Sequence, residues 1–166
     1  MRKRKILIGS MGICLVIFSG CGNRAQVEKS YEITASKVGQ LMISQAEACI
    51  SQSRAYQAVW EYAKVSDMDF KSAAKEMLGP QTSQNKATMV ENKSMIESLL
   101  EDLKEPPAKF EETHKKLEEL YEIYVKLHDL AMDPLDDMDK HMKSVGELSD
   151  QIAEKARELN AALIVK

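Results

Sequence analysis

The chain has 166 residues, of which 26 are acidic and 23 are Lys or Arg, and its formal net charge is −3. This length is enough for one domain with a sizeable hydrophobic core. Beyond the first five residues, no stretch gathers Lys and Arg into the basic face that nucleic-acid binding requires, so we expect no nucleic-acid partner.

Residues 1–20 have the three parts of a secretory signal peptide. Four basic residues are followed by an apolar run over residues 6–18 and then by small residues. The apolar run has thirteen residues, whereas a membrane-spanning helix needs about 20. We therefore expect residues 1–20 to be a cleaved leader and not a transmembrane helix.

Small residues stand directly before a cysteine at the end of this leader. The sequence Phe18, Ser19, Gly20 and Cys21 resembles the lipobox of bacterial lipoproteins. The resemblance implies that Cys21 becomes the first residue of the mature chain and carries a diacylglyceryl thioether, with fatty acids such as palmitate. The alternative is an ordinary secreted protein with a cysteine at this place by chance.

Lipidation of Cys21 would determine where the protein works. A single acyl chain gives only marginal membrane binding, whereas two chains anchor a protein stably. In lipoproteins of this kind Gly22 gives no retention signal, which favours the outer surface of a Gram-positive cell. We expect a lipid-anchored protein on the extracytoplasmic face of the cell membrane.

Cleavage before Cys21 would leave a more acidic protein. Four basic residues and no acidic ones are removed, so the net charge of the remaining 146 residues falls from −3 to −7. Residues 21–26 are predicted to be the lipidated cysteine and a short polar linker, and residues 27–166 the folded domain. A linker over residues 22–26 spans only about 17 Å when extended, which predicts a domain close to the membrane.

Cys49 would be the one unmodified cysteine of the mature chain. No internal disulfide can then form. Its apolar and small neighbours favour a small buried hydrophobic residue, and the alternative is a reactive or dimer-forming thiol.

The folded part shows helical spacing throughout and no alternation with period two. Long helices are predicted over about residues 27–65, 85–104, 107–132 and 134–164, with a short helix over residues 70–78. The face of the first helix repeats at three-four spacing like a heptad seam. Its members are Tyr31, Ala35, Val38, Met42, Gln45, Cys49, Gln52, Tyr56, Val59 and Ala63.

The helix boundaries are marked by Gly, Pro and Asp. Gly79 and Pro80 should end the short helix, and the polar residues 81–84 should form a turn. Pro107 should start the next long helix, and Asp133 should cap the last helix with Pro134 in its first turn. Short connections place successive helices antiparallel. The sequence therefore predicts an all-α, up-and-down bundle of about four helices with one short helix added.

Residues 60–159 resemble an uncharacterised group of helical lipoproteins from Gram-positive bacteria. The resemblance lies in the residues Trp60, Asp69 and Phe70 and in the segments 106–110, 117–121 and 127–134. It implies a helical fold and a location at the cell envelope. The group has no established activity, so the resemblance implies no reaction.

No motif for catalysis is present, and we expect no enzyme activity. The sequence contains neither Gly-x-Ser-x-Gly nor His-Glu-x-x-His, and nothing near Cys49 supplies a partnered base. A di-iron bundle site needs two Glu-x-x-His motifs, and only Glu111 with His114 forms one. His114, Tyr121 and His128 share one stripe, which permits haem or single-metal binding; the alternative is partly exposed histidines at the edge of the core. We expect no cofactor.

Polar amides occupy positions on the predicted apolar seams. Gln45 and Gln52 lie on the first seam and Asn92 on the third helix. A buried amide needs hydrogen-bond partners, and one known use is to fix the register of packed helices. The alternative is the lining of a groove for a ligand or partner, formed with Tyr56, Trp60 and Tyr124.

The function that the sequence favours is non-catalytic binding of an envelope protein or an extracellular ligand by a lipid-anchored helical bundle. The alternative is a lipoprotein that binds a small molecule, haem or a metal ion.

Overall fold

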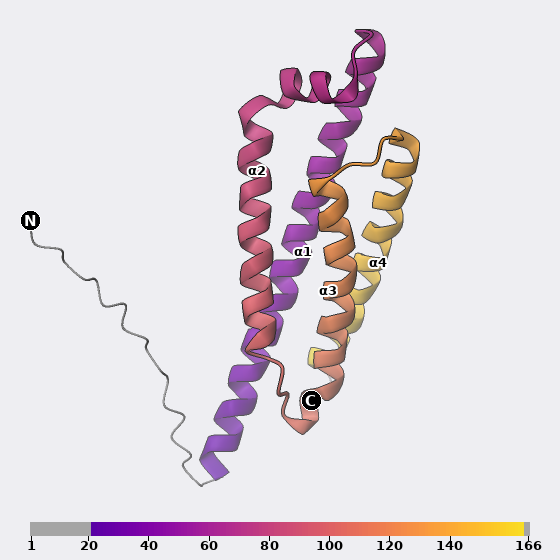
Figure 1. Cartoon of the computed structure of the whole chain (residues 1–166). Coiled ribbons are helices and arrows are strands. Elements are labelled where there is room, and N and C mark those ends of the chain that lie inside the picture. Colours follow the sequence, from indigo (N-terminus) through magenta and orange to yellow (C-terminus); the bar gives the residue numbers. More distant parts are fainter. Residues whose placement is uncertain (1–20, 165–166) are drawn as a thin grey trace, which may run out of the picture.

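A computed structural model describes residues 21–164, and the side chains of residues 21–23 and 81 are not part of that description. The predictions for Phe18, Ser19, Gly20 and the Cys21 side chain therefore lie outside the described residues. The predicted all-α bundle is confirmed. The elements are α1 (Cys21–Val65), α2 (Phe70–Glu101), the 3-10 helix η1 (Ala108–Phe110), α3 (Glu111–Met132) and α4 (Met138–Ile164), and no strand forms within residues 21–164. Figure 1 shows the long helices running alternately up and down.

The three-four spacing correctly predicts the core. Every member of the α1 seam is buried except Gln45, which is partly buried. In α3 the residues Thr113, Leu117, Leu120, Tyr124, Leu127 and Ala131, which recur at three-four spacing, are all buried. These faces meet in one hydrophobic cluster over most of their length, and Val59 and Ala63 near the end of α1 belong to a second, smaller cluster.

The helices are not packed as a square. α1 packs against α2, α3 and α4, and α3 also packs against α4, whereas α2 packs closely on α1 alone. The α2–α3 side is bridged by long side chains instead: Tyr121 Oη donates to Glu97 Oε1 at 2.6 Å, and Lys86 Nζ donates to the Met132 carbonyl at 2.6 Å. α1 and α3 therefore form the short diagonal of the bundle.

The linker prediction is wrong for residues 22–26, because α1 begins at Cys21 and includes them. The segment contains no Pro, and Arg24 Nε bonds to Glu28 Oε1 at 2.9 Å, an i,i+4 pair that supports a helix. Glu28 also pairs with Lys109 at 2.7 Å, which ties the first turns of α1 to the start of η1.

α2 joins two of the predicted helices. Gly79 has the non-helical angles φ 45° and ψ −138°, so the helical geometry is interrupted at the residue that was predicted to end the short helix. Residues 81–84 are helical and do not form a turn, because Pro80 stands at the start of the second arm, where its missing N–H costs no hydrogen bond. The first arm lies across the end of the bundle (Figure 1), and its Ala73 packs against Val59 and Ala63.

The start of α4 differs from the prediction. Asp137, not Asp133, caps the helix: its Oδ1 accepts from the Lys140 N–H at 2.9 Å, and its carbonyl accepts from the His141 N–H at 2.9 Å. Because these groups already satisfy the first turn of α4, Pro134 stays in the loop. Leu135, which the helix predicted over residues 134–164 would include, lies before α4 and is 39% exposed.

Candidate functional site: a neutral groove between α1 and α2

A hollow of about 360 Å³ lies between α1 and the second arm of α2. Gln52 and Met89 are buried at its floor, and Ser51, Asn85 and Thr88 are exposed at its rim. The complete lining is Gln45, Ala48, Ser51, Gln52, Ala55, Asn85, Thr88, Met89 and Asn92. None of these side chains is ionisable, although 30% of the residues in the chain are charged.

Two amide pairs cross the hollow. Asn92 Nδ2 donates to Gln45 Oε1 at 2.9 Å, and Asn85 Nδ2 approaches Gln52 Oε1 at 3.4 Å. The members of each helix are seven residues apart, so the two pairs are separated by about 10.5 Å at 1.5 Å per residue. The first pair has good hydrogen-bond geometry, and the second is near the limit of a hydrogen bond.

The spacing of small residues explains why a hollow forms here. Ala48 and Ala55 lie between and beside the two glutamines on the same side of α1. The long amide side chains span the distance between the helices, whereas the alanine side chains fill little of it. The space between the pairs is therefore left open.

The amides keep hydrogen-bonding capacity that the helices do not use. Each pair uses one nitrogen and one oxygen, which leaves the Gln45 and Gln52 nitrogens and the Asn85 and Asn92 oxygens. None of these atoms is among the buried unpartnered atoms of the described residues. All four residues line the groove, so these unused groups are available to a molecule bound in it.

Tyr56 and Trp60 lie in a different place, where the first arm of α2 crosses α1. Tyr56 Oη donates to the Ala131 carbonyl at 3.0 Å, and Trp60 stacks on Phe70 with ring centroids 4.5 Å apart. The His141 ring lies 5.3 Å from the Trp60 ring. These residues form the aromatic cluster, which fixes the end of the bundle and does not line the groove.

Tyr124 lies in the core and not at the groove. It is fully buried, its hydroxyl has no partner within the described residues, and burial raises the pKa of that hydroxyl. The structure thus brings Gln45 and Gln52 to one groove and Tyr56 and Trp60 to one cluster, and it does not bring all five residues to a single site. Sequence reasoning missed Asn85 and Thr88. The sequence does contain a signal for Asn85, since it precedes Asn92 by seven residues and therefore shares its helix face.

The histidines are separated. His114 lies near Tyr31, with Tyr31 Oη 3.2 Å from its Nδ1, and its Nε2 is 3.4 Å from Glu118. His128 is buried, whereas the alternative to haem binding expected partly exposed histidines, and its ring lies 6.0 Å from the ring of Tyr124 on the same helix. Within residues 21–164 no group of three or more His, Cys, Asp or Glu side chains is placed to hold a metal ion.

Cys49 is buried as expected. Burial raises the pKa of its thiol to about 12. The thiol therefore stays protonated at neutral pH, and since the thiolate is the reactive form, Cys49 is a poor nucleophile in the folded protein.

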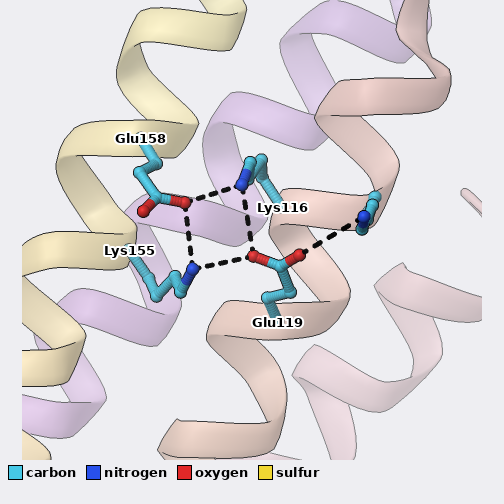
Figure 2. A network of polar contacts seen from close by, with 5 residues as sticks. Lys116, Glu119, Lys155 and Glu158 are labelled. Carbon is cyan, nitrogen blue, oxygen red and sulfur yellow. Dashed lines mark hydrogen bonds and ion pairs between the residues drawn. The ribbon is translucent and has the colours of Figure 1, made fainter.

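The other side of the bundle is held by charges. Lys116 and Glu119 of α3 and Lys155 and Glu158 of α4 form a closed ring of alternating charge, with N–O distances from 2.7 to 3.3 Å (Figure 2). Hydrogen bonds within the ring raise the pKa of both lysines and lower the pKa of both glutamates. In this charge ring every member has partners of opposite sign, unlike the amides of the groove, which keep unused hydrogen-bonding groups.

No protein-family model, curated protein or solved structure matches the chain. Among the helices of residues 21–164, none combines the length and the apolar character that crossing a membrane requires.

Proposed function

We propose that this protein is a lipid-anchored binding module on the extracytoplasmic face of the cell membrane, and that the groove between α1 and α2 is its binding surface. The leader and the lipobox residues Phe18, Ser19 and Gly20 before Cys21 support the anchoring. The observation that carries the binding function is the neutral groove with its unused amide groups.

The chemistry of the groove supports binding better than catalysis. Ser51 and Thr88 supply hydroxyl groups, but the lining contains no His, Asp, Glu or Lys that could act as a general base. A hydroxyl nucleophile needs such a partner. Amide side chains, in contrast, both donate and accept hydrogen bonds and can recognise a neutral polar partner.

The length of α1 sets the distance between the groove and the proposed anchor. Gln45 follows Cys21 by 24 residues in one continuous helix. At 1.5 Å per residue this is about 36 Å. The groove would therefore be held away from the lipid surface, accessible to partners beside the membrane, and not close to it as a flexible short linker would imply.

Anchoring is tested by Cys21→Ala expressed in a bacterium with a lipoprotein pathway. The variant is expected to leave the membrane fraction and to migrate differently on a gel, since it cannot receive the diacylglyceryl group. A variant that stays in the membrane with unchanged migration would overturn the proposal of a lipid anchor.

The binding surface is tested by photo-crosslinking on intact cells. A photoreactive residue replaces Thr88 at the groove rim or, as the control, Glu154, which is exposed on α4. The proposal predicts a discrete adduct from position 88 and none from position 154. Equal labelling at both positions, or labelling from position 154 alone, would show that the groove is not the binding surface.

Haem or metal binding is the alternative. His128 and His141 are buried and each has an unpartnered Nε2. They lie on separate helices, α3 and α4, and no cluster of potential ligands accompanies them within residues 21–164. Absorbance in the Soret region and metal analysis of the purified protein separate the two functions: one bound equivalent would replace the binding-module proposal.

A further inference from the structure

The dimensions of the groove restrict what can bind in it. Its two amide pairs are about 10.5 Å apart along the helices. Three residues of an extended peptide span about 10 to 11 Å. An extended chain laid along the groove would therefore present a backbone amide to the first pair and, three residues further on, another to the second.

The hydrogen-bonding groups match a peptide backbone. The Gln45 and Gln52 nitrogens can donate to peptide carbonyls, and the Asn85 and Asn92 oxygens can accept from peptide N–H groups. Each amide pair thus offers one donor and one acceptor, which are the two groups that every non-proline peptide unit requires.

The floor and the charge restrict the side chains of the peptide. Successive side chains of an extended chain point to opposite sides, so alternate ones would face Ala48, Ala55 and Met89. Small apolar or hydroxyl side chains fit such a floor, and Met adapts to irregular shapes. A charged side chain there would lose hydration without gaining a counter-charge, because the lining contains none.

A glycan fits the lining less well. Sugar rings present apolar faces that commonly stack on aromatic side chains, and none of Tyr, Trp, Phe or His lines this groove. The aromatic cluster with Tyr56 and Trp60 is packed against Phe70 and His141 instead.

We infer that the α1–α2 groove binds an extended peptide segment of about four residues with small, uncharged side chains, read mainly through its backbone by the two amide pairs. The inference rests on the proposed function and adds the chemical class of the ligand. A partner protein would supply the segment as an exposed, unstructured stretch.

The test uses the full chain purified in detergent and labelled with ¹⁵N. Its probe is the capped peptide acetyl-Ala-Ser-Ala-Ser-Ala-amide, and the side-chain NH₂ signals of Gln45, Gln52, Asn85 and Asn92 are followed. We expect these four signals to shift with saturation in the millimolar range. A capped peptide of the same length with Glu or Lys at every position, so that charged side chains face the floor in either register, should bind at least tenfold more weakly.

Two variants separate recognition from folding. Gln52→Leu with Asn85→Leu removes one amide pair and should weaken peptide binding about tenfold, the effect of one or two hydrogen bonds. Thr88→Trp leaves the amides in place and fills the exposed rim, and it should also block the peptide. Far-UV circular dichroism like that of the unmodified chain confirms that both variants fold.

The outcomes distinguish this inference from the proposed function. If the peptide shifts none of the four signals, or shifts them equally in the variants, the inference is wrong. If tetra-N-acetylchitotetraose shifts the four signals and the peptide does not, the ligand class is a glycan; the groove is still the binding surface. If position 88 also gives no adduct on cells, the proposed function fails as well.

Discussion

His141 gives the aromatic cluster a dependence on pH. Its side chain is fully buried at the start of α4 beside Trp60 and Tyr56, and its Nε2 has no hydrogen-bond partner. The Nδ1 accepts only a long bond, 3.4 Å, from the Leu135 N–H. Burial lowers the pKa of the imidazole below its usual 6.5 because the charged form is poorly solvated there.

The groups around the ring offer no compensation for a positive charge. Asp137 on the same helix uses its carbonyl for the His141 backbone N–H and its carboxylate for Lys140. Across the cluster, Lys86 lies 5.7 Å from the centre of the Tyr56 ring and would repel an imidazolium. Among the described residues burial alone shifts the pKa of His141, with no contribution from a charged partner.

The size of the effect follows from proton linkage. Between the unfolded pKa near 6.5 and the lower folded pKa, the unfolded chain binds the proton and the folded chain does not. The contribution of His141 to the free energy of unfolding is therefore fully present above pH 6.5. It is lost as the pH falls from there to the folded pKa, by at most about 1.4 kcal/mol per pH unit. The carboxyl groups with lowered pKa have unfolded values of 3.8 to 4.5, so their contribution is lost mainly below about pH 5 and leaves the range above pH 5.5 nearly clear.

The assay is urea unfolding followed by circular dichroism at half-unit steps from pH 8 to pH 5.5. The unmodified chain should lose up to about 1.4 kcal/mol of unfolding free energy by pH 5.5, and His141→Phe, which keeps an aromatic ring against Trp60, should show a flat profile over this range. His114→Gln at the other end of the bundle is the control and should keep the slope. A profile that is flat for the unmodified chain, or unchanged in His141→Phe, would refute the reasoning.

Three further predictions concern packing, reactivity and charge. A Cβ on Gly39 would come within 2.6 Å of Leu159 Cδ2, so Gly39→Ala should destabilise the fold by about 1 kcal/mol. In the Leu159→Ala background the same change should stabilise the fold by about 1 kcal/mol, because only the gain in helix propensity remains. Urea unfolding of the unmodified chain and the three variants measures both effects, and equal effects in the two backgrounds would contradict the close approach. Cys49 should react with Ellman's reagent at least tenfold more slowly in the native than in the urea-unfolded protein, because only the native thiol has a raised pKa; equal rates would mean that the thiol is accessible. Lys116→Glu should lower the melting temperature by placing like charges in the charge ring, and adding Glu158→Lys should recover part of the loss; no recovery would show that the ring is not a coupled unit.

The buried faces of the helices could be predicted from the sequence, because burial on one side of a helix produces a periodic pattern of apolar residues. Val38, Met42 and Cys49 could be assigned to the core from spacing alone, and all are buried. Helix boundaries were harder where two capping residues compete. Asp133 and Asp137 are both good caps, and only the hydrogen bonds of the folded loop show that Asp137 is used.

Which helix faces pack against each other could not be predicted from one sequence. Spacing shows that Gln45 is on a seam, but not that Asn92 lies opposite it, because that depends on which helices pack and in what register. The burial of His128 could not be predicted for the same reason, since it depends on how the helices pack against one another. The groove is therefore a tertiary feature. Some of its residues could be named from the sequence, but their meeting at one place could not be predicted.

The central claim is that the amides of the groove serve binding and not only helix register. Replacing Gln45 and Asn92 together by Leu separates these roles, because exchanging both partners of a hydrogen bond for apolar groups can be nearly neutral for stability. The decisive measurement is the amount of adduct captured from position 88 on intact cells, with and without the double substitution, at equal expression. We expect the unmodified chain and the double variant to have unfolding free energies within about 1 kcal/mol of each other, and the double variant to give at least tenfold less adduct. Undiminished capture by the stable double variant would contradict it.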